Sequence, residues 1–157
     1  MITIQPIAAK DRSQLLALVR KQKNFNAQEV EVAIEVIDDT LNPEKNDYQI
    51  LIAKTGEDKV VGFICYGEIP MTDRRFDLYW VAVDPHLGRQ GIGLLLLTQM
   101  ETELTGQGSA KVYVDTSSTP GYDSARGFYE KNGYRVACVF PDFYRDGDDK
   151  VVYLKEL

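Results

Sequence analysis

Apolar residues along this chain recur at two different spacings, which predict alternating strands and helices. Met1 to Gln5 is predicted to be a strand. Asp11, with Gln14 three residues later, resembles a capping box at the start of a helix. The apolar face of that helix would contain Leu15, Leu18 and Val19. A second helix is predicted to end at Asn42-Pro43, and its apolar positions are Val30, Ile34, Ile37 and Leu41.

The middle of the chain is predicted to form a hairpin followed by a buried strand. The hairpin strands would run from Tyr48 to Lys54 and from Lys59 to Gly67, joined by the turn residues Gly56, Glu57 and Asp58. The segment from Phe76 to Val83 is almost entirely apolar, as expected of a strand that is covered on both faces.

Two more helices and three more strands are predicted in the second half. One helix should run from about Gly91 to Thr105 and stop at Gly106. Thr119 is expected to cap the other, with Pro120 at its first position, and Asn132-Gly133 should end it. The strands would be Lys111 to Thr116, Tyr134 to Phe140 and Lys150 to Leu154, with the last two flanking a turn at Asp146-Gly147-Asp148-Asp149. This order implies a mixed sheet packed between helices.

Composition narrows the class of protein. The 157 residues, 44% of them hydrophobic, are enough for one domain with a proper core, so residues 1–157 are expected to form a single domain. No apolar run reaches about 18 residues and the N-terminus does not resemble a secretory signal, so we expect a soluble, cytoplasmic protein with no membrane partner. Cys65 and Cys138 lie in apolar, strand-like runs and are predicted to be buried free thiols. With only one histidine and two scattered cysteines to serve as ligands, we expect no metal site.

The formal net charge of −6 argues against a nucleic-acid partner, because phosphate neutralisation calls for a basic face. Residues 29–58 contain nine acidic side chains against only Lys45 and Lys54. This acidic segment is either a solvated helix face with its turns or a rim that attracts a cationic substrate.

The segment from Leu78 to Leu97 predicts a strand, a glycine-containing turn and a helix, which is an arrangement that binds anions. Gly91 and Gly93 would let a ligand approach the backbone closely. A P-loop is excluded because Leu94 and Leu95 stand where it needs Lys and Ser or Thr. The chain does not match the dinucleotide-binding fingerprint, because Leu96 occupies the position of its third glycine. Asp115 does fit that pattern, as a residue that could accept a hydrogen bond from a ribose.

What remains resembles the acetyl-CoA-binding motif of the GNAT superfamily of N-acetyltransferases. The residues that carry the resemblance are Val81-Ala82-Val83, Asp84-Pro85 and Gly91-x-Gly93, followed by a leucine-rich helix. A second segment, Ser124 to Tyr134, is similar to a later motif of that family. The chain departs from the family pattern at Gly88, where Arg or Gln is usual and Arg89 follows instead, and at Tyr122, where Asn is usual.

This resemblance implies an α/β fold: a mixed, mostly antiparallel sheet of about seven strands, splayed at the central strands and flanked by about four helices. It implies an acyltransferase that moves an acetyl group from acetyl-CoA to a primary amine of a small molecule or peptide, by direct attack in a ternary complex. The expected partners are acetyl-CoA and the amine acceptor, with a homodimer as one possible assembly. An acyl-CoA-binding regulatory module, and a transferase acting on hydroxyls or carrying longer acyl chains, stay open as alternatives.

The resemblance also implies roles for particular residues. Tyr129 matches the general acid, and Glu68 and Asp77 are the candidates for the general base. The residues implied in cofactor binding are Val81, Ala82, Val83, Arg89, Gln90, Gly91, Ile92, Gly93, Leu94, Ala125, Arg126, Tyr129 and Lys131. Those implied in acceptor binding are Phe25, Asn26, Glu29 and Glu68.

Overall fold

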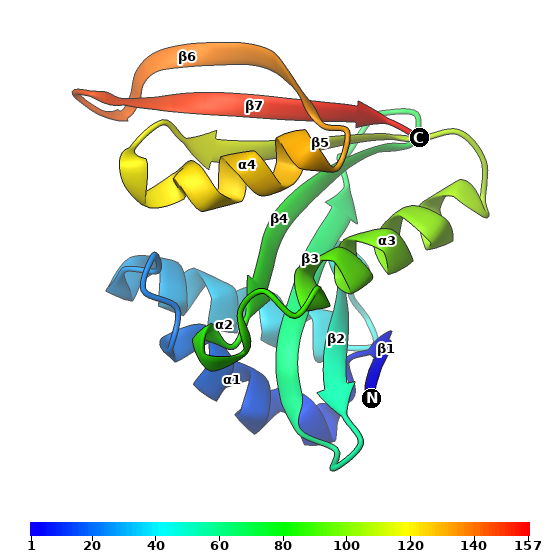
Figure 1. Ribbon diagram of the computed structural model, residues 1–157. Helices are drawn as coiled ribbons and strands as arrows, with labels where there is room; N and C mark the ends of the chain where they lie inside the picture. Colours follow the sequence, from blue (N-terminus) through cyan, green and yellow to red (C-terminus); the bar gives the residue numbers. More distant parts are fainter.

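A seven-stranded sheet runs through the computed structural model, which describes residues 1–157, in the order β1-β2-β3-β4-β5-β7-β6 (Figure 1). All neighbouring strands are antiparallel except β4 and β5, which are parallel. The strands are β1 (Ile2–Pro6), β2 (Gln49–Thr55), β3 (Val60–Glu68), β4 (Arg75–Val83), β5 (Lys111–Ser117), β6 (Arg135–Arg145) and β7 (Asp148–Glu156). The mixed, mostly antiparallel sheet predicted from the sequence is confirmed.

Four α-helices cover the two faces of the sheet. In Figure 1, α1 (Arg12–Arg20) and α2 (Ala27–Leu41) lie behind it, whereas α3 (Ile92–Thr105) and α4 (Asp123–Lys131) lie in front. Three short 3-10 helices precede α1, α3 and α4: η1 (Ala9–Asp11), η2 (Pro85–Leu87) and η3 (Pro120–Tyr122). No helix is both long and apolar enough to span a membrane.

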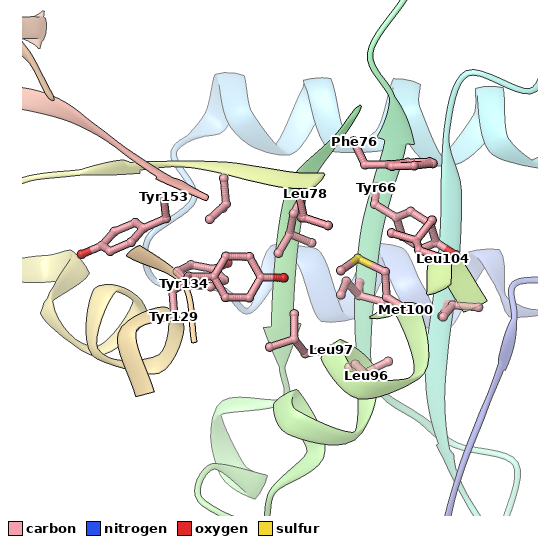
Figure 2. Close-up of a cluster of buried hydrophobic side chains, with 14 of the residues drawn as sticks. Tyr66, Phe76, Leu78, Leu96, Leu97, Met100, Leu104, Tyr129, Tyr134 and Tyr153 are labelled. Carbon is pink, nitrogen blue, oxygen red and sulfur yellow. The ribbon is translucent and has the colours of Figure 1, made fainter. Parts of the chain in front are cut away.

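Each helical layer has its own hydrophobic core. Figure 2 shows the front core, where Leu96, Leu97 and Met100 of α3 lie beside Leu78 of β4. Burying a leucine side chain stabilises a fold by about 1.5–3 kcal/mol. The core behind the sheet joins α1 and α2 to the other side of β2 and β3. Because both faces of these strands are covered, nearly every residue of β3 is buried.

The two parallel strands part soon after they pair. Only residues 75–77 of β4 and 111–113 of β5 are in register. Just beyond, Trp80 pairs with Cys65 and Leu78 with Tyr66, which leaves Tyr79 as an extra residue in β4. A bulge of this kind bends a strand and increases its twist. The predicted splay at the central strands is therefore present, and it lies beside a bulge.

Two predicted cap residues occupy the N-cap positions but lack the capping hydrogen bond of their side chains. The capping box predicted at Asp11 is wrong, because the carboxylate of Asp11 accepts from the amide of Ala8 at 3.0 Å and pairs with Lys54 Nζ at 2.6 Å. Asp11 and Lys54 are both buried, so the ion pair takes the carboxylate away from the helix end. Thr119 is the N-cap residue as predicted, but its side chain makes no capping bond, since its hydroxyl bonds to that of Ser117 at 2.7 Å. Pro120 nevertheless begins a helix, the 3-10 turn η3.

Three predictions about strands need correction. β4 is not covered on both faces, since exposure alternates along it and Tyr79 is 38% exposed. The last two strands extend further than predicted, so the turn narrows to Asp146-Gly147 and Asp148 belongs to β7. Cys138 is exposed, whereas Cys65 is buried as predicted. Cys138 lies in the edge strand β6, where every residue is exposed because no helix covers it.

Candidate active site

The turn between β4 and α3 presents backbone amides on one side of the splay. Asp84 opens it by accepting from the amide of His86 at 3.0 Å, and this bond together with nearby Lys21 lowers the pKa of Asp84. Gly91 follows as the N-cap of α3 in the left-handed conformation, with φ of 76°. The first helical bond runs from the amide of Leu95 to the carbonyl of Gly91. The amides before Leu95 therefore have no acceptor within the helix, and the helix dipole favours an anion there.

A cavity of about 640 Å³ adjoins this turn, between α3 and α4. Ten of the predicted cofactor residues line it: Val81, Val83, Arg89, Gly91, Ile92, Gly93, Leu94, Ala125, Tyr129 and Lys131. The wall also contains residues that were not among the predicted cofactor residues: Asn24, Leu87, Gly88, Ser124, Phe128 and Asn132. Most of these flank predicted residues in the chain, but Asn24 comes from the distant α1–α2 loop and no motif marks it.

Three predicted cofactor residues do not line this cavity. Ala82 is buried in the core behind the sheet, and Gln90 is exposed in the turn. Arg126 is held by its neighbours: its guanidinium donates to the carbonyls of Ser117 and Thr119 and pairs with Asp123. The arginine therefore braces the β5–α4 connection.

The wall of the cavity beside α3 suits a ligand with a phosphate group. A Cβ added at Gly91 would meet nothing within 4 Å, and one at Gly93 would come to 3.6 Å from the ring of Phe128. Both glycines thus leave space beside the free amides of α3. Arg89 and Lys131 add positive charge to the same wall.

Tyr129 lies at the inner end of this cavity. Its side chain is only 6% exposed and belongs to the front core, where Figure 2 shows it grouped with Tyr134 and Tyr153. The hydroxyl of Tyr153 donates to Glu130 at 2.7 Å, whereas that of Tyr129 makes no hydrogen bond to the protein. Burial raises the pKa of Tyr129, so the phenol keeps its proton at neutral pH.

A second cavity, of about 450 Å³, opens on the α1–α2 side of the splay. Three predicted acceptor residues, Phe25, Asn26 and Glu29, line it. Asn26 caps α2 by accepting from the amide of Glu29 at 2.8 Å. Burial raises the pKa of Glu29, and the charge of Arg145 only partly opposes that rise. The other lining residues are Asn24, Tyr79, Trp80, Asp115, Ser117, Thr119, Tyr122, Tyr144, Arg145 and Asp148.

The two cavities adjoin the splay between β4 and β5 and share one lining residue. Asn24 lines both, and its side chain donates to the carbonyl of Gly121 at 3.3 Å. The hydroxyl of Tyr122 donates back to the carbonyl of Asn24 at 3.4 Å. These bonds join the α1–α2 loop to η3 across the splay. Tyr122, the residue that departs from the family pattern, thus forms part of the second cavity's wall.

The structure separates the candidate carboxylates. Glu68 lines neither cavity; it lies at the end of β3 and accepts from the amide of Arg74 at 3.1 Å. Asp77 also lines neither, but it is half-buried opposite Tyr113, and burial followed by the charge of Asp115 raises its pKa. Asp115 lines the second cavity and lies 3.3 Å from Lys150 Nζ.

Sequence reasoning noticed Asp115 only as a possible ribose acceptor. Its position two residues before the end of β5 is a signal for a site, because residues at the carboxyl end of a parallel strand face the crevice where strands diverge.

Comparisons with known proteins agree with this architecture. The family model for an acetyltransferase (GNAT) domain matches residues 46–136. A structure from Desulfovibrio desulfuricans, assigned to the GNAT family of acetyltransferases, is 32% identical with a TM-score of 0.94, and the match covers 99% of each chain. A comparison with curated proteins found no match.

More distant structures share the fold. The ribosomal-protein-S18-alanine N-acetyltransferase of Escherichia coli is 20% identical, with a TM-score of 0.78 over 99% of this chain and 94% of that one. The PaiA N-acetyltransferase of Thermoplasma acidophilum, solved in complex with coenzyme A, is 19% identical, with a TM-score of 0.75 over 100% and 99% of the two chains. Together with the family model and the Desulfovibrio structure, the splayed sheet and its glycine turn establish that this chain belongs to the GNAT family of acetyltransferases.

Proposed function

We propose that the protein transfers an acetyl group from acetyl-CoA to a primary amine by direct attack in a ternary complex. The observation that carries the proposal is the pair of cavities on opposite faces of the sheet, which adjoin the splay and share Asn24. Two substrates that enter from opposite faces can bind together and bring their reacting atoms to one place. The coenzyme A bound to the PaiA N-acetyltransferase supports such a ligand for the first cavity.

The walls of the first cavity suit the parts of acetyl-CoA. The free amides at the start of α3, with Arg89 and Lys131, would hold the pyrophosphate. Val81 and Val83 would border the pantetheine arm, where β4 has lost its β5 partner. Acetyl-CoA supplies an activated thioester when it is bound.

The acceptor amine must lose its proton before it can attack. For an amine with a pKa of about 10.4, this costs roughly 4 to 5 kcal/mol at pH 7. We propose that the second cavity, called the acceptor cavity from here on, binds the amine. We assign the role of general base to Asp115, acting directly or through a water molecule, because it lines this cavity whereas Glu68 and Asp77 do not. Asp77 is a second carboxylate close enough for the charge of Asp115 to act on it.

Tyr129 is proposed to protonate the departing thiolate. Its phenol borders the first cavity, has no competing hydrogen bond, and is kept protonated by burial. Transfer from a phenol of pKa about 10 to a thiolate of pKa about 8.5 is uphill by roughly 2 kcal/mol before burial is considered. Burial makes the phenolate less stable, but it destabilises a thiolate in the same apolar surroundings as well.

Thiol release from acetyl-CoA in the presence of a panel of amines tests the function. The panel should contain amino acids, polyamines, aminoglycosides and peptides with free N-termini. We expect Asp115→Asn to lower kcat/KM about 100-fold or more with the best acceptor, because general-base catalysis contributes about 10²–10⁴-fold. Glu68→Gln, which removes a carboxylate outside both cavities, is the matched control. An equal loss in both variants would refute the assignment of Asp115, and binding without thiol release from any amine would favour a regulatory module.

A further inference from the structure

The charges around the acceptor cavity are mostly paired within the protein. Arg145 Nη1 lies 2.7 Å from Asp148 Oδ2, and the arginine side chain is 70% exposed. Asp115 has Lys150 at 3.3 Å. Glu29 forms no salt bridge, and Arg145, which already pairs with Asp148, acts on it only through a longer-range coulombic attraction. Glu29 is therefore the carboxylate of this cavity that lacks a salt-bridge partner of its own.

Aromatic side chains share this cavity with Glu29. Five of the cavity's lining residues are aromatic: Phe25, Tyr79, Trp80, Tyr122 and Tyr144. The rings of Phe25 and Trp80 pack with their centroids 6.0 Å apart, and those of Tyr79 and Trp80 are 6.2 Å apart. Aromatic faces attract cations, most strongly where water is excluded. Glu29 and these rings thus form a wall suited to a positive charge.

This wall is separate from the place where acetyl transfer would occur. The reacting amine must reach the splay between β4 and β5, beside Asp115, whereas Glu29 projects from the first turn of α2. A ligand that satisfies both groups needs an amine at one end and a second cation at the other. The volume of about 450 Å³ is large enough for such a molecule.

We propose that the acceptor is a dication, whose second positive group binds Glu29 and the aromatic wall while its amine reacts beside Asp115. This inference rests on the proposed function and specifies the class of its acceptor. The main alternative is that Arg145 binds a negatively charged acceptor. We prefer a cation because Arg145 already pairs with Asp148.

Three acceptors with the same carbon chain test the proposal: butylamine, diaminobutane and aminobutyrate, with a hexyl series as a longer set. Thiol release from acetyl-CoA gives kcat/KM for each. We expect the diamine to exceed the monoamine at least 10-fold and the amino acid to be the poorest. Glu29→Gln should reduce the diamine-to-monoamine ratio severalfold. Glu31→Gln, which removes an exposed charge from the same helix end, should leave the ratio unchanged.

Equal kcat/KM for monoamine and diamine in both series, or a preference for the amino acid, would overturn the proposal while leaving the acetyltransferase function intact. If no amine releases thiol, the proposed function fails. The affinities of the three compounds for the CoA-saturated protein then test whether this cavity binds a dication. Preferential diamine binding that Glu29→Gln abolishes would support the inference, and indifferent binding would overturn it.

Discussion

Two neighbouring tyrosines differ in what their hydroxyl groups can do. The rings of Tyr129 and Tyr134 are 5.6 Å apart, and both side chains are buried in the front core. The hydroxyl of Tyr134 is buried without a hydrogen-bond partner and lines neither cavity. The side chain of Tyr129 borders the first cavity. Access to the cavity, rather than residue type or burial, is what suits Tyr129 to proton transfer.

Replacing Tyr129 by phenylalanine should lower kcat about 100-fold, in the range that a lost general acid produces, and leave acetyl-CoA affinity nearly unchanged. Steady-state kinetics of thiol release, with chemistry shown to limit the rate, measures this. Tyr134→Phe is the matched control, because it removes a hydroxyl from the same cluster that touches neither cavity. The general-acid assignment fails if kcat is unchanged in Tyr129→Phe or falls equally in both variants.

Among the elements, the connection from β4 to α3 depends on its two caps. Asp84 is buried, caps η2 and forms a salt bridge with Lys21, whose Nζ lies 3.4 Å from Oδ2. Gly91 then begins α3 in a conformation that other residues adopt only with strain. The first cap orients the turn and the second exposes the amides at the start of the helix. The geometry of the anion site therefore follows from the way this short connection is built.

Asp84→Ala should destabilise the protein by about 1 kcal/mol, and lower Tm by roughly 2–4 °C at pH 7, because the cap is lost. Since the folded state lowers the pKa of Asp84, its stabilisation is complete above the ordinary aspartate pKa and is lost as pH falls through the lowered value. Thermal unfolding should therefore show that the Tm difference between the wild type and Asp84→Ala is smaller below pH 4 than at pH 7. Asp73→Ala, at an exposed loop position, is the control. A difference that is independent of pH would contradict this account.

At the scale of the whole molecule, the splay places two cavities on opposite faces of one sheet. The front cavity draws on β4, α3 and α4, and the rear one on α2, β4, β5 and the β6–β7 hairpin. The exposed edge strand β6 leaves that side of the sheet unpaired. The homodimer suggested by the family resemblance stays a prediction.

Acetyl-CoA should raise Tm, because it would bind the folded state alone. At a concentration 100 times Kd the stabilisation is about 2.7 kcal/mol, or roughly 5 to 10 °C for a domain of this size. Gly93→Ala should fold normally, since the added Cβ makes ordinary contacts with Phe128 and Val81. It should nevertheless reduce the rise in Tm caused by acetyl-CoA, because the added methyl group narrows the cavity. Differential scanning fluorimetry measures both effects. No shift at millimolar acetyl-CoA would rule out the cofactor assignment.

The order of strands and helices, the hairpin between β2 and β3, and the glycine turn before α3 could be predicted from the sequence because local spacing and turn residues specify them. Ten residues predicted to bind the cofactor line the first cavity, since most of its wall lies within two short segments of the chain. Asp11 and Thr119 lie at the N-cap positions, but neither side chain makes a capping hydrogen bond. Each side chain instead bonds to a partner outside its own helix, Lys54 on β2 and Ser117 on β5.

The family, the chain order of the elements and the glycine turn before α3 could be inferred from the sequence, because they rest on residues close together in the chain. The folded structure alone shows which carboxylates share the second cavity, that Arg126 braces the β5–α4 connection, and that Cys138 is exposed. The first of these properties depends on the fold, which brings Glu29 on α2, Asp115 on β5 and Asp148 on β7 to one cavity. Because these residues are far apart in the chain, no local pattern encodes their proximity.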